Sequence, residues 1–144
     1  METQSIEDNI NNAESKVSPL GGDLEGAVVA IVGVGLIGGS MALALKEKGI
    51  AKKIIGVGRS AASIAKAIEL GIIDEALPLE EAVKQADFIY VSIPVDATIP
   101  VMQQIMDMIT DKQFVVDAGS TKAALCKALS GHPMRKQFVA THPM

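Results

Sequence analysis

The chain has 144 residues, of which 49% are hydrophobic and 3% aromatic, and its net charge is −4. This length accommodates one domain with a short tail, and the absence of a basic stripe with interleaved aromatics excludes nucleic acid as a partner. The single cysteine, Cys126, excludes an internal disulfide and favours a reducing compartment, so we expect a cytoplasmic protein in which Cys126 is a small buried hydrophobe.

The first 26 residues are polar and acidic, with six acidic side chains against the single Lys16. They show no hydrophobic periodicity, so we expect a flexible polar tail over 1–26 and a folded domain over 27–144. The segment Ala27–Leu45 has no charged residue and is long enough to span a membrane. Its glycines favour a strand, a turn and a helix instead, so no membrane span is expected.

Short runs rich in Val and Ile alternate with helical patterns from Ala27 onward. We predict strands at Ala27–Val32, Lys53–Val57, Glu75–Leu77 (weak), Asp87–Ile93, Gln113–Ala118 and Gln137–Thr141. The predicted helices are one ending at Lys48, followed by Ala61–Leu70, Leu79–Gln85, Thr98–Ile109 (with Pro100 in its first turn) and Thr121–Leu129. This alternation predicts an α/β fold, a doubly wound parallel sheet of the Rossmann type in a single domain.

Three glycines spaced as G-x-G-x-x-G, namely Gly33, Gly35 and Gly38, follow the first strand and open the first helix. In a dinucleotide-binding unit the first allows a tight turn, the second lets the backbone approach the pyrophosphate, and the third lets helix and strand pack closely. The backbone N–H groups at Leu36 and Ile37 would then face the diphosphate. Three glycines at this spacing favour a nicotinamide dinucleotide site over a simple turn.

The end of the second strand distinguishes the two nicotinamide cofactors. Sites that prefer NAD usually carry an acidic residue about 20 residues after the glycine motif, and here that position is Gly58. Arg59 and Ser60 follow and can bind a 2′-phosphate. We therefore expect NADP, with NAD as the alternative if Arg59 is an ordinary solvated loop residue.

Four motifs together resemble the prephenate and arogenate dehydrogenases over residues 27–144. They are the glycine segment that continues to Ser40, Ser92-Ile93-Pro94, Asp117-x-Gly-Ser120-x-Lys122, and His142-Pro-Met at the end of the chain. The resemblance implies an oxidoreductase of tyrosine biosynthesis. It would oxidise the ring carbon that bears the hydroxyl with NAD(P)⁺, while the ring loses CO₂.

The resemblance also implies roles for individual residues. His142 matches the catalytic histidine that accepts the hydrogen bond of the substrate hydroxyl, and Ser120 matches a serine that positions the nicotinamide and this histidine. Ser92, Ile93 and Pro94 are expected to line the cofactor site, which lies beyond the carboxyl ends of the strands. The role of Lys122 is left open. No metal is expected, and His132 is expected to be a surface loop residue.

The family also has a helical domain that follows the nucleotide-binding domain, forms most of the dimer interface and supplies arginines for the substrate carboxylates. We expect that domain to be absent from this chain. The chain alone would then bind cofactor without turnover, and a homodimer is expected only with that domain. The sequence does not distinguish prephenate from arogenate as the substrate. Alternative functions are a β-hydroxyacid-type dehydrogenase, a pyrroline carboxylate reductase relative, or a non-catalytic dinucleotide sensor.

Overall fold

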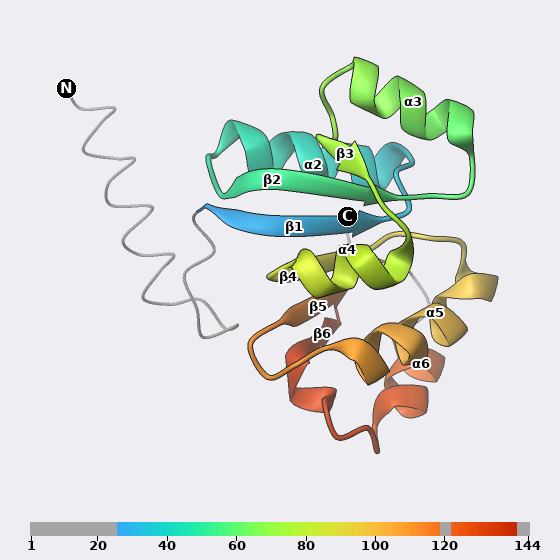
Figure 1. The fold of residues 1–144 in the computed structure, drawn as a ribbon. Helices are drawn as coiled ribbons and strands as arrows, with labels where there is room; N and C mark the ends of the chain where they lie inside the picture. Colours follow the sequence, from blue (N-terminus) through green and yellow to red (C-terminus); the bar gives the residue numbers. More distant parts are fainter. Residues whose placement is uncertain (1–25, 119–121, 141–144) are drawn as a thin grey trace, which may run out of the picture.

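The computed structural model describes residues 26–118 and 122–140, which form one parallel sheet with helices on both faces (Figure 1). The strands are β1 (Ala27–Val32), β2 (Ala51–Val57), β3 (Glu75–Ala76), β4 (Phe88–Val91), β5 (Phe114–Asp117) and β6 (Phe138–Ala140). The helices are α2 (Leu36–Glu47), α3 (Ala61–Glu69), α4 (Leu79–Gln85), α5 (Val95–Met108), α6 (Lys122–Leu129) and a 3₁₀ turn, η1 (Arg135–Gln137).

The six strands lie in the order β3-β2-β1-β4-β5-β6, and every neighbouring pair is parallel. This is the Rossmann order, in which the chain moves outward in one direction from β1 and then returns to continue from β4 in the other. The predicted fold class is therefore confirmed. The strand order reverses between β1 and β4, where a parallel sheet of this kind places its ligand.

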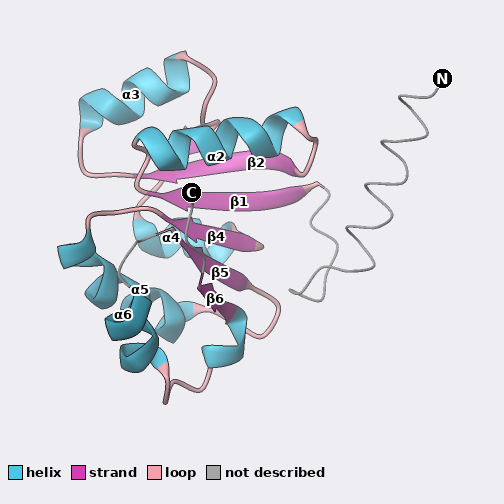
Figure 2. Cartoon of the chain, turned by 180° about the vertical axis from the view of Figure 1, so that it is seen from behind, coloured by secondary structure: helices cyan, strands magenta, loops and turns pink. Residues whose placement is uncertain are grey.

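Helices cover both faces of the sheet (Figure 2), and a hydrophobic layer lies between the sheet and the helices on each face. Alternate residues of β1 point to opposite faces, so Ala30 and Val32 pack beneath α4, α5 and α6, whereas Val29 and Ile31 pack beneath α2 and α3. All four are nearly inaccessible to solvent. Strands buried on both faces explain why the strands read as continuous apolar runs in the sequence.

Helix α5 differs from its predicted position. It begins at Val95, three residues before the expected Thr98, so Pro100 lies in the second turn rather than the first. Pro100 has no N–H to donate to the carbonyl of Asp96, four residues earlier. The buried Thr98 hydroxyl reinforces this turn by donating to the carbonyl of Pro94 at 3.0 Å. Pro94, not Pro100, marks the start of the helix.

β1 has its predicted bounds, and the other strands differ from theirs by at most two residues at either end. β2 begins at Ala51, β4 ends at Val91, and the short η1 turn precedes β6. Cys126 is half-buried and packs against the α4–α5–α6 layer, so it is less enclosed than expected.

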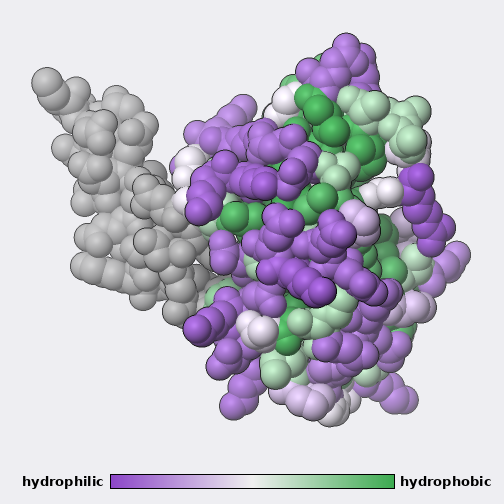
Figure 3. All heavy atoms as spheres, viewed as in Figure 1, coloured by the Kyte–Doolittle hydropathy of each residue, from purple (hydrophilic) through white to green (hydrophobic). Residues whose placement is uncertain are grey.

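Hydrophobic side chains reach the surface over α3, where Ile68 is 44% exposed (Figure 3). No helix in the described part of the chain is long and apolar enough to cross a membrane.

The predicted tail lies almost wholly outside the described residues, as does Thr141 at the predicted end of the last strand.

Candidate functional site

A cleft of about 780 Å³ lies beyond the carboxyl ends of β1, β2 and β4. In Figure 1 the arrowheads of β1 and β2 point to the right, so this edge of the sheet is on the right of that view. The volume is within the range of small-molecule and cofactor sites. The lining residues come from the three strand ends and the turns that follow them, and from the first parts of α3, α4 and α5: Val32, Gly33, Val34, Gly35, Val57, Gly58, Arg59, Ser60, Ser63, Ile64, Leu79, Ser92, Ile93, Pro94, Asp96, Ala97 and Val101.

The glycine turn at the floor of the cleft is shaped by steric limits on two of its residues. Gly33 has φ +96°, and a Cβ there would lie 2.2 Å from the Ser92 carbonyl oxygen. A Cβ on Gly38 would lie 2.2 Å from the Gly33 carbonyl oxygen and 3.0 Å from the Ile31 side chain. No other residue fits at either position without a shift of the backbone. The turn therefore brings the start of α2 directly against β1.

Gly35 differs, because a Cβ there would meet nothing within 4 Å. Gly35 is the N-cap of α2, no side chain caps this helix, and its first turn has no acidic residue. The first N–H groups of a helix have no partner within the helix, and with the helix dipole they attract an anion. The space beside Gly35 thus adjoins donors suited to a diphosphate. The side chains of Leu36 and Ile37 are 88% and 48% exposed and do not line the cleft.

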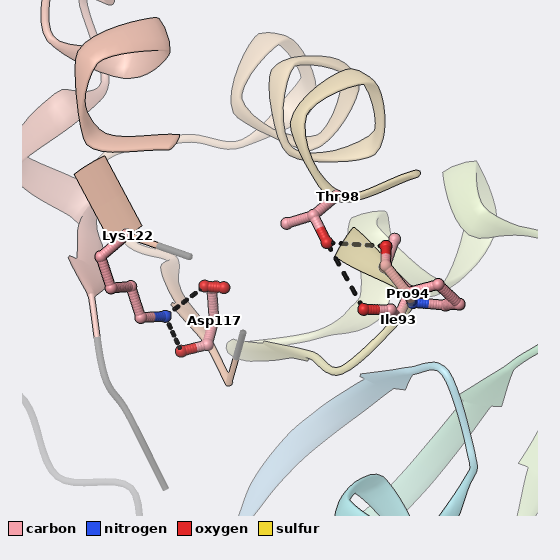
Figure 4. Close-up of polar contacts among 5 residues, drawn as sticks. All are labelled: Ile93, Pro94, Thr98, Asp117 and Lys122. Carbon is pink, nitrogen blue, oxygen red and sulfur yellow. Dashed lines mark hydrogen bonds and ion pairs between the residues drawn. The ribbon is translucent and has the colours of Figure 1, made fainter. Parts of the chain in front are cut away.

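Ser92, at the end of β4, supports the glycine turn from below. Its hydroxyl donates to the Gly33 carbonyl at 2.7 Å, and its N–H donates to the Val32 carbonyl at 2.8 Å. The Ser92 side chain is therefore engaged within the protein, although it also lines the cleft. Beyond it, Thr98 donates toward the carbonyls of Ile93 and Pro94 and holds this strand end against α5 (Figure 4).

The turn from β2 to α3 supplies the positive charge of the cleft. Arg59 is exposed, and within residues 26–118 and 122–140 no carboxylate pairs with it. The Ser60 side chain caps α3 by accepting from the Ser63 N–H at 3.2 Å. Its hydroxyl proton can still be donated to a ligand. Guanidinium, hydroxyl and helix N-terminus together form a set of donors suited to a phosphate.

Asp96 is a lining residue that the sequence analysis missed. It lies in the first turn of α5 and is the one carboxylate among the lining residues. A carboxylate only accepts hydrogen bonds when ionised, which suits it to sugar hydroxyls or an amino group. The sequence contains a signal for this position, an acidic residue two positions after Pro94. That signal has meaning only if the helix begins at Val95.

The Asp117–Lys122 pair lies at the end of β5, beside the strand that carries Ser92 (Figure 4). The ammonium group of Lys122 contacts the Asp117 carboxylate and also donates to the Asp117 carbonyl at 3.0 Å. The Asp117 side chain is almost fully buried. Burial raises the pKa of the neighbouring Tyr90, and the negative charge of Asp117 raises it further. Lys122, whose role was open, thus joins the end of β5 to the start of α6.

Among the predicted cofactor-binding residues, Gly33, Gly35, Arg59, Ser60, Ser92, Ile93 and Pro94 line this cleft, and Gly38 packs behind it. The proposed catalytic residues Ser120 and His142 lie outside the described residues. His132 lies in a loop, as expected, and both of its ring nitrogens form hydrogen bonds. Nε2 lies 2.7 Å from the Asp107 carboxylate, and Nδ1 accepts from the Met134 N–H at 3.0 Å. No group of side chains that could hold a metal ion occurs in the described part.

A model of the nucleotide-binding domain of prephenate dehydrogenase matches residues 41–144, well over half of the chain. The prephenate dehydrogenase of Bacillus subtilis is 36% identical over 119 residues, which cover 81% of this chain and 32% of that protein. The chain thus spans about a third of the length of this curated relative.

Two solved structures of related enzymes superpose on most of this chain. Prephenate dehydrogenase from A. aeolicus, in complex with hydroxyphenyl propionate and NAD⁺, is 35% identical with a TM-score of 0.73 and covers 81% of this chain and 41% of that one. Synechocystis arogenate dehydrogenase is 28% identical with a TM-score of 0.70 and covers 81% of this chain and 40% of that one.

Proposed function

The chain belongs to the prephenate dehydrogenase family through its nucleotide-binding domain, and we propose that its cleft binds NADP in preference to NAD. Because the chain belongs to this family, the β-hydroxyacid dehydrogenase and pyrroline carboxylate reductase alternatives no longer apply. The observation that carries the proposal is the composition of the β2–α3 turn. A glycine stands there in place of an acid, and the arginine that follows it has no ion pair among the described residues.

The described residues fit a dinucleotide. Gly35 leaves open space at the uncapped start of α2, which suits the diphosphate, and this start lies where the strand order reverses. The largely apolar walls from Ile64, Leu79 and Val101 suit a planar base. When bound, the nicotinamide group supplies the acceptor for hydride.

The preference for NADP rests on charge and hydrogen bonding at the second ribose position. An acid at Gly58 would bind the 2′-hydroxyl of NAD and repel a 2′-phosphate, and this chain has no side chain there. Arg59 lines the cleft and carries no ion pair in the described part of the chain, so its fork of donors is available. The NAD⁺ in the A. aeolicus structure belongs to that enzyme, and the two proteins need not share a preference.

Titration calorimetry of the chain with each cofactor tests this proposal. We expect NADP⁺ to bind about 10- to 100-fold more tightly than NAD⁺, as a phosphate that gains charge-assisted hydrogen bonds would. Equal affinities, or tighter NAD⁺ binding, would overturn the NADP assignment and leave the dinucleotide site itself in place.

For the complete enzyme we propose the reaction of the family, the oxidative decarboxylation of prephenate or arogenate in tyrosine biosynthesis. In this proposal His142 accepts the hydrogen bond of the substrate hydroxyl, and Ser120 positions the histidine and the nicotinamide. A neutral imidazole suits this role because its ordinary pKa is close to 6.5, so the acceptor form is available at cellular pH.

His142→Asn in a full-length protein that contains this domain tests the catalytic proposal. The substitution should lower kcat by about 10²- to 10⁴-fold, the usual contribution of a general base, while the Kd for NADP⁺ stays close to that of the wild type. An unchanged kcat would remove His142 from the mechanism. A wild-type full-length protein that binds NADP⁺ but turns over neither substrate would instead support the sensor alternative.

A further inference from the structure

The backbone conformation at position 58 does not require a glycine. Its φ is outside the left-handed region, unlike that of Gly33, so the backbone at this position accepts any L-residue. The glycine at the cofactor-determining position therefore needs another physical reason.

A side chain from the following helix lies close to this position. A Cβ on Gly58 would lie 3.1 Å from Cδ1 and 3.3 Å from Cγ1 of Ile64, closer than carbon atoms normally approach. Ile64 lies in the first turn of α3, where its N–H donates to the Ser60 carbonyl at 3.0 Å. The Ile64 side chain is half-buried and packs against the core layer beneath α2 and α3. It is held on one side by the core and on the other lines the cleft.

We propose that Ile64 determines cofactor specificity together with Gly58, because its side chain occupies the space that the stem of an acidic residue at position 58 would need. The inference rests on the proposed NADP site. It adds that the preference is not set by Gly58 and Arg59 alone. An NAD-type acid enters this turn only when the side chain at position 64 becomes smaller.

The steric part is tested without cofactor, by melting temperatures. Gly58→Ala should lower the melting temperature relative to Gly131→Ala, by up to about 4 °C, because its Cβ crowds the Ile64 side chain. The same substitution should cost less in an Ile64→Val background, which lacks Cδ1, and least in Ile64→Ala, which lacks both contact atoms. Gly131→Ala is the matched control, since a Cβ there meets nothing within 4 Å. Equal losses in all three backgrounds would overturn the inference.

The specificity part is tested by the Kd for NAD⁺ and NADP⁺ in a cycle of Gly58→Asp and Ile64→Val, with Ile64→Ala as the second background. Gly58→Asp alone should weaken NADP⁺ at least about tenfold, through repulsion of the phosphate, without improving NAD⁺. In combination with the smaller residue at 64 it should tighten NAD⁺ about tenfold or more. Gly131→Asp, which adds the same charge outside the cleft, should change neither value.

The two proposals fail in different ways. If Gly58→Asp alone tightens NAD⁺ as much as the double variants do, Ile64 has no part in specificity, whatever the wild-type preference. If the wild type binds both cofactors equally, the NADP assignment fails. The NAD⁺ cycle still measures whether Ile64 excludes the acid, and tightening only in the double variants would uphold that exclusion.

Discussion

The two turns that open α2 and α3 border the same cleft but recognise a ligand in opposite ways. The turn at Gly33 is closed by backbone contacts, with no room for a side chain. The turn at Gly58 ends in two side chains that can donate hydrogen bonds, Arg59 and Ser60. The first therefore suits the diphosphate that all dinucleotides share, and the second suits the ribose group by which NAD and NADP differ.

This contrast separates steric from chemical recognition. Where backbone packing leaves no room for a side chain, as at Gly33, a substitution should affect both cofactors and the fold together. Replacing an exposed donor of the second turn, such as Arg59, should instead leave the fold intact and alter one cofactor only. The contrast would fail if a substitution at Gly33 changed only the cofactor preference, or if removal of the Arg59 side chain destabilised the fold.

The largest effect is expected for Gly33→Ala. The new Cβ would need a left-handed backbone and would lie 2.2 Å from a carbonyl oxygen, which together should cost about 3 kcal/mol or more of unfolding free energy. Urea unfolding measures this loss. Gly35→Ala is the matched control, because its Cβ has open space. It should leave stability nearly unchanged and weaken both cofactors alike. A stable Gly33→Ala variant would show that the turn is not sterically closed.

The next effect is expected for Arg59→Ala. Loss of the guanidinium should weaken NADP⁺ by about 1–3 kcal/mol and leave NAD⁺ nearly unchanged, since only the phosphate uses these donors. Calorimetric titration of both cofactors gives the two values. Lys52→Ala removes the same charge from an exposed position that does not line the cleft and should keep the selectivity. Parallel weakening of both cofactors by Arg59→Ala would indicate a contact that does not involve the phosphate.

Much of this site could be predicted from sequence because its signals are local. The glycine spacing identifies the closed turn, and the alternation of apolar strands and helices identifies the parallel sheet. The start of α5 was misplaced because Pro100 was taken as the mark of a first turn, while Pro94 has that role. Asp96 was missed for the same reason, since it belongs to the cleft only when the helix begins at Val95.

The remaining features depend on contacts that a sequence does not display. The hydroxyl of Ser92 reaches a carbonyl 59 residues earlier, so the motif identified the residue without its hydrogen bond. The contact of Ile64 with position 58 depends on how the first turn of α3 is placed beside the strand end. Lys122 matched a family motif, but its contact with the buried Asp117 carboxylate appears only in three dimensions.

A smaller effect is expected for Ser92→Ala, which removes the hydrogen bond that supports the closed turn. The lost bond, 2.7 Å long, should cost about 1 kcal/mol and weaken both cofactors to the same extent. Ser130→Ala removes a hydroxyl-to-carbonyl bond of 2.9 Å in an exposed turn and should cost less. Urea unfolding and titration with both cofactors measure the two outcomes. A loss of NADP⁺ alone would assign the Ser92 hydroxyl to the ligand rather than to the turn.

The smallest effect concerns Asp74, which joins the elements that carry the two turns. Its carboxylate accepts from the Ile54 N–H of β2 at 2.7 Å and from Lys46 of α2 at 2.9 Å. Burial alone would raise the pKa of Asp74, but these hydrogen bonds and the charges of Lys46 and Lys53 lower it below its ordinary value.

A carboxylate with a lowered pKa stabilises the fold at neutral pH, and that stability is lost as the pH falls below about 4, through the pKa of the folded state. Because the Asp74 side chain is 42% exposed, solvent screening should keep the contribution well under about 1 kcal/mol. Asp74→Asn should therefore flatten the lowest part of the profile of unfolding free energy against pH, measured by urea unfolding. Asp111→Asn, a residue without an ion pair in the described part of the chain, should leave the profile unchanged. If Asp74→Asn leaves the acid limb as steep as in the wild type, the link between α2 and β2 does not depend on this charge, and the two turns are held in place by packing alone.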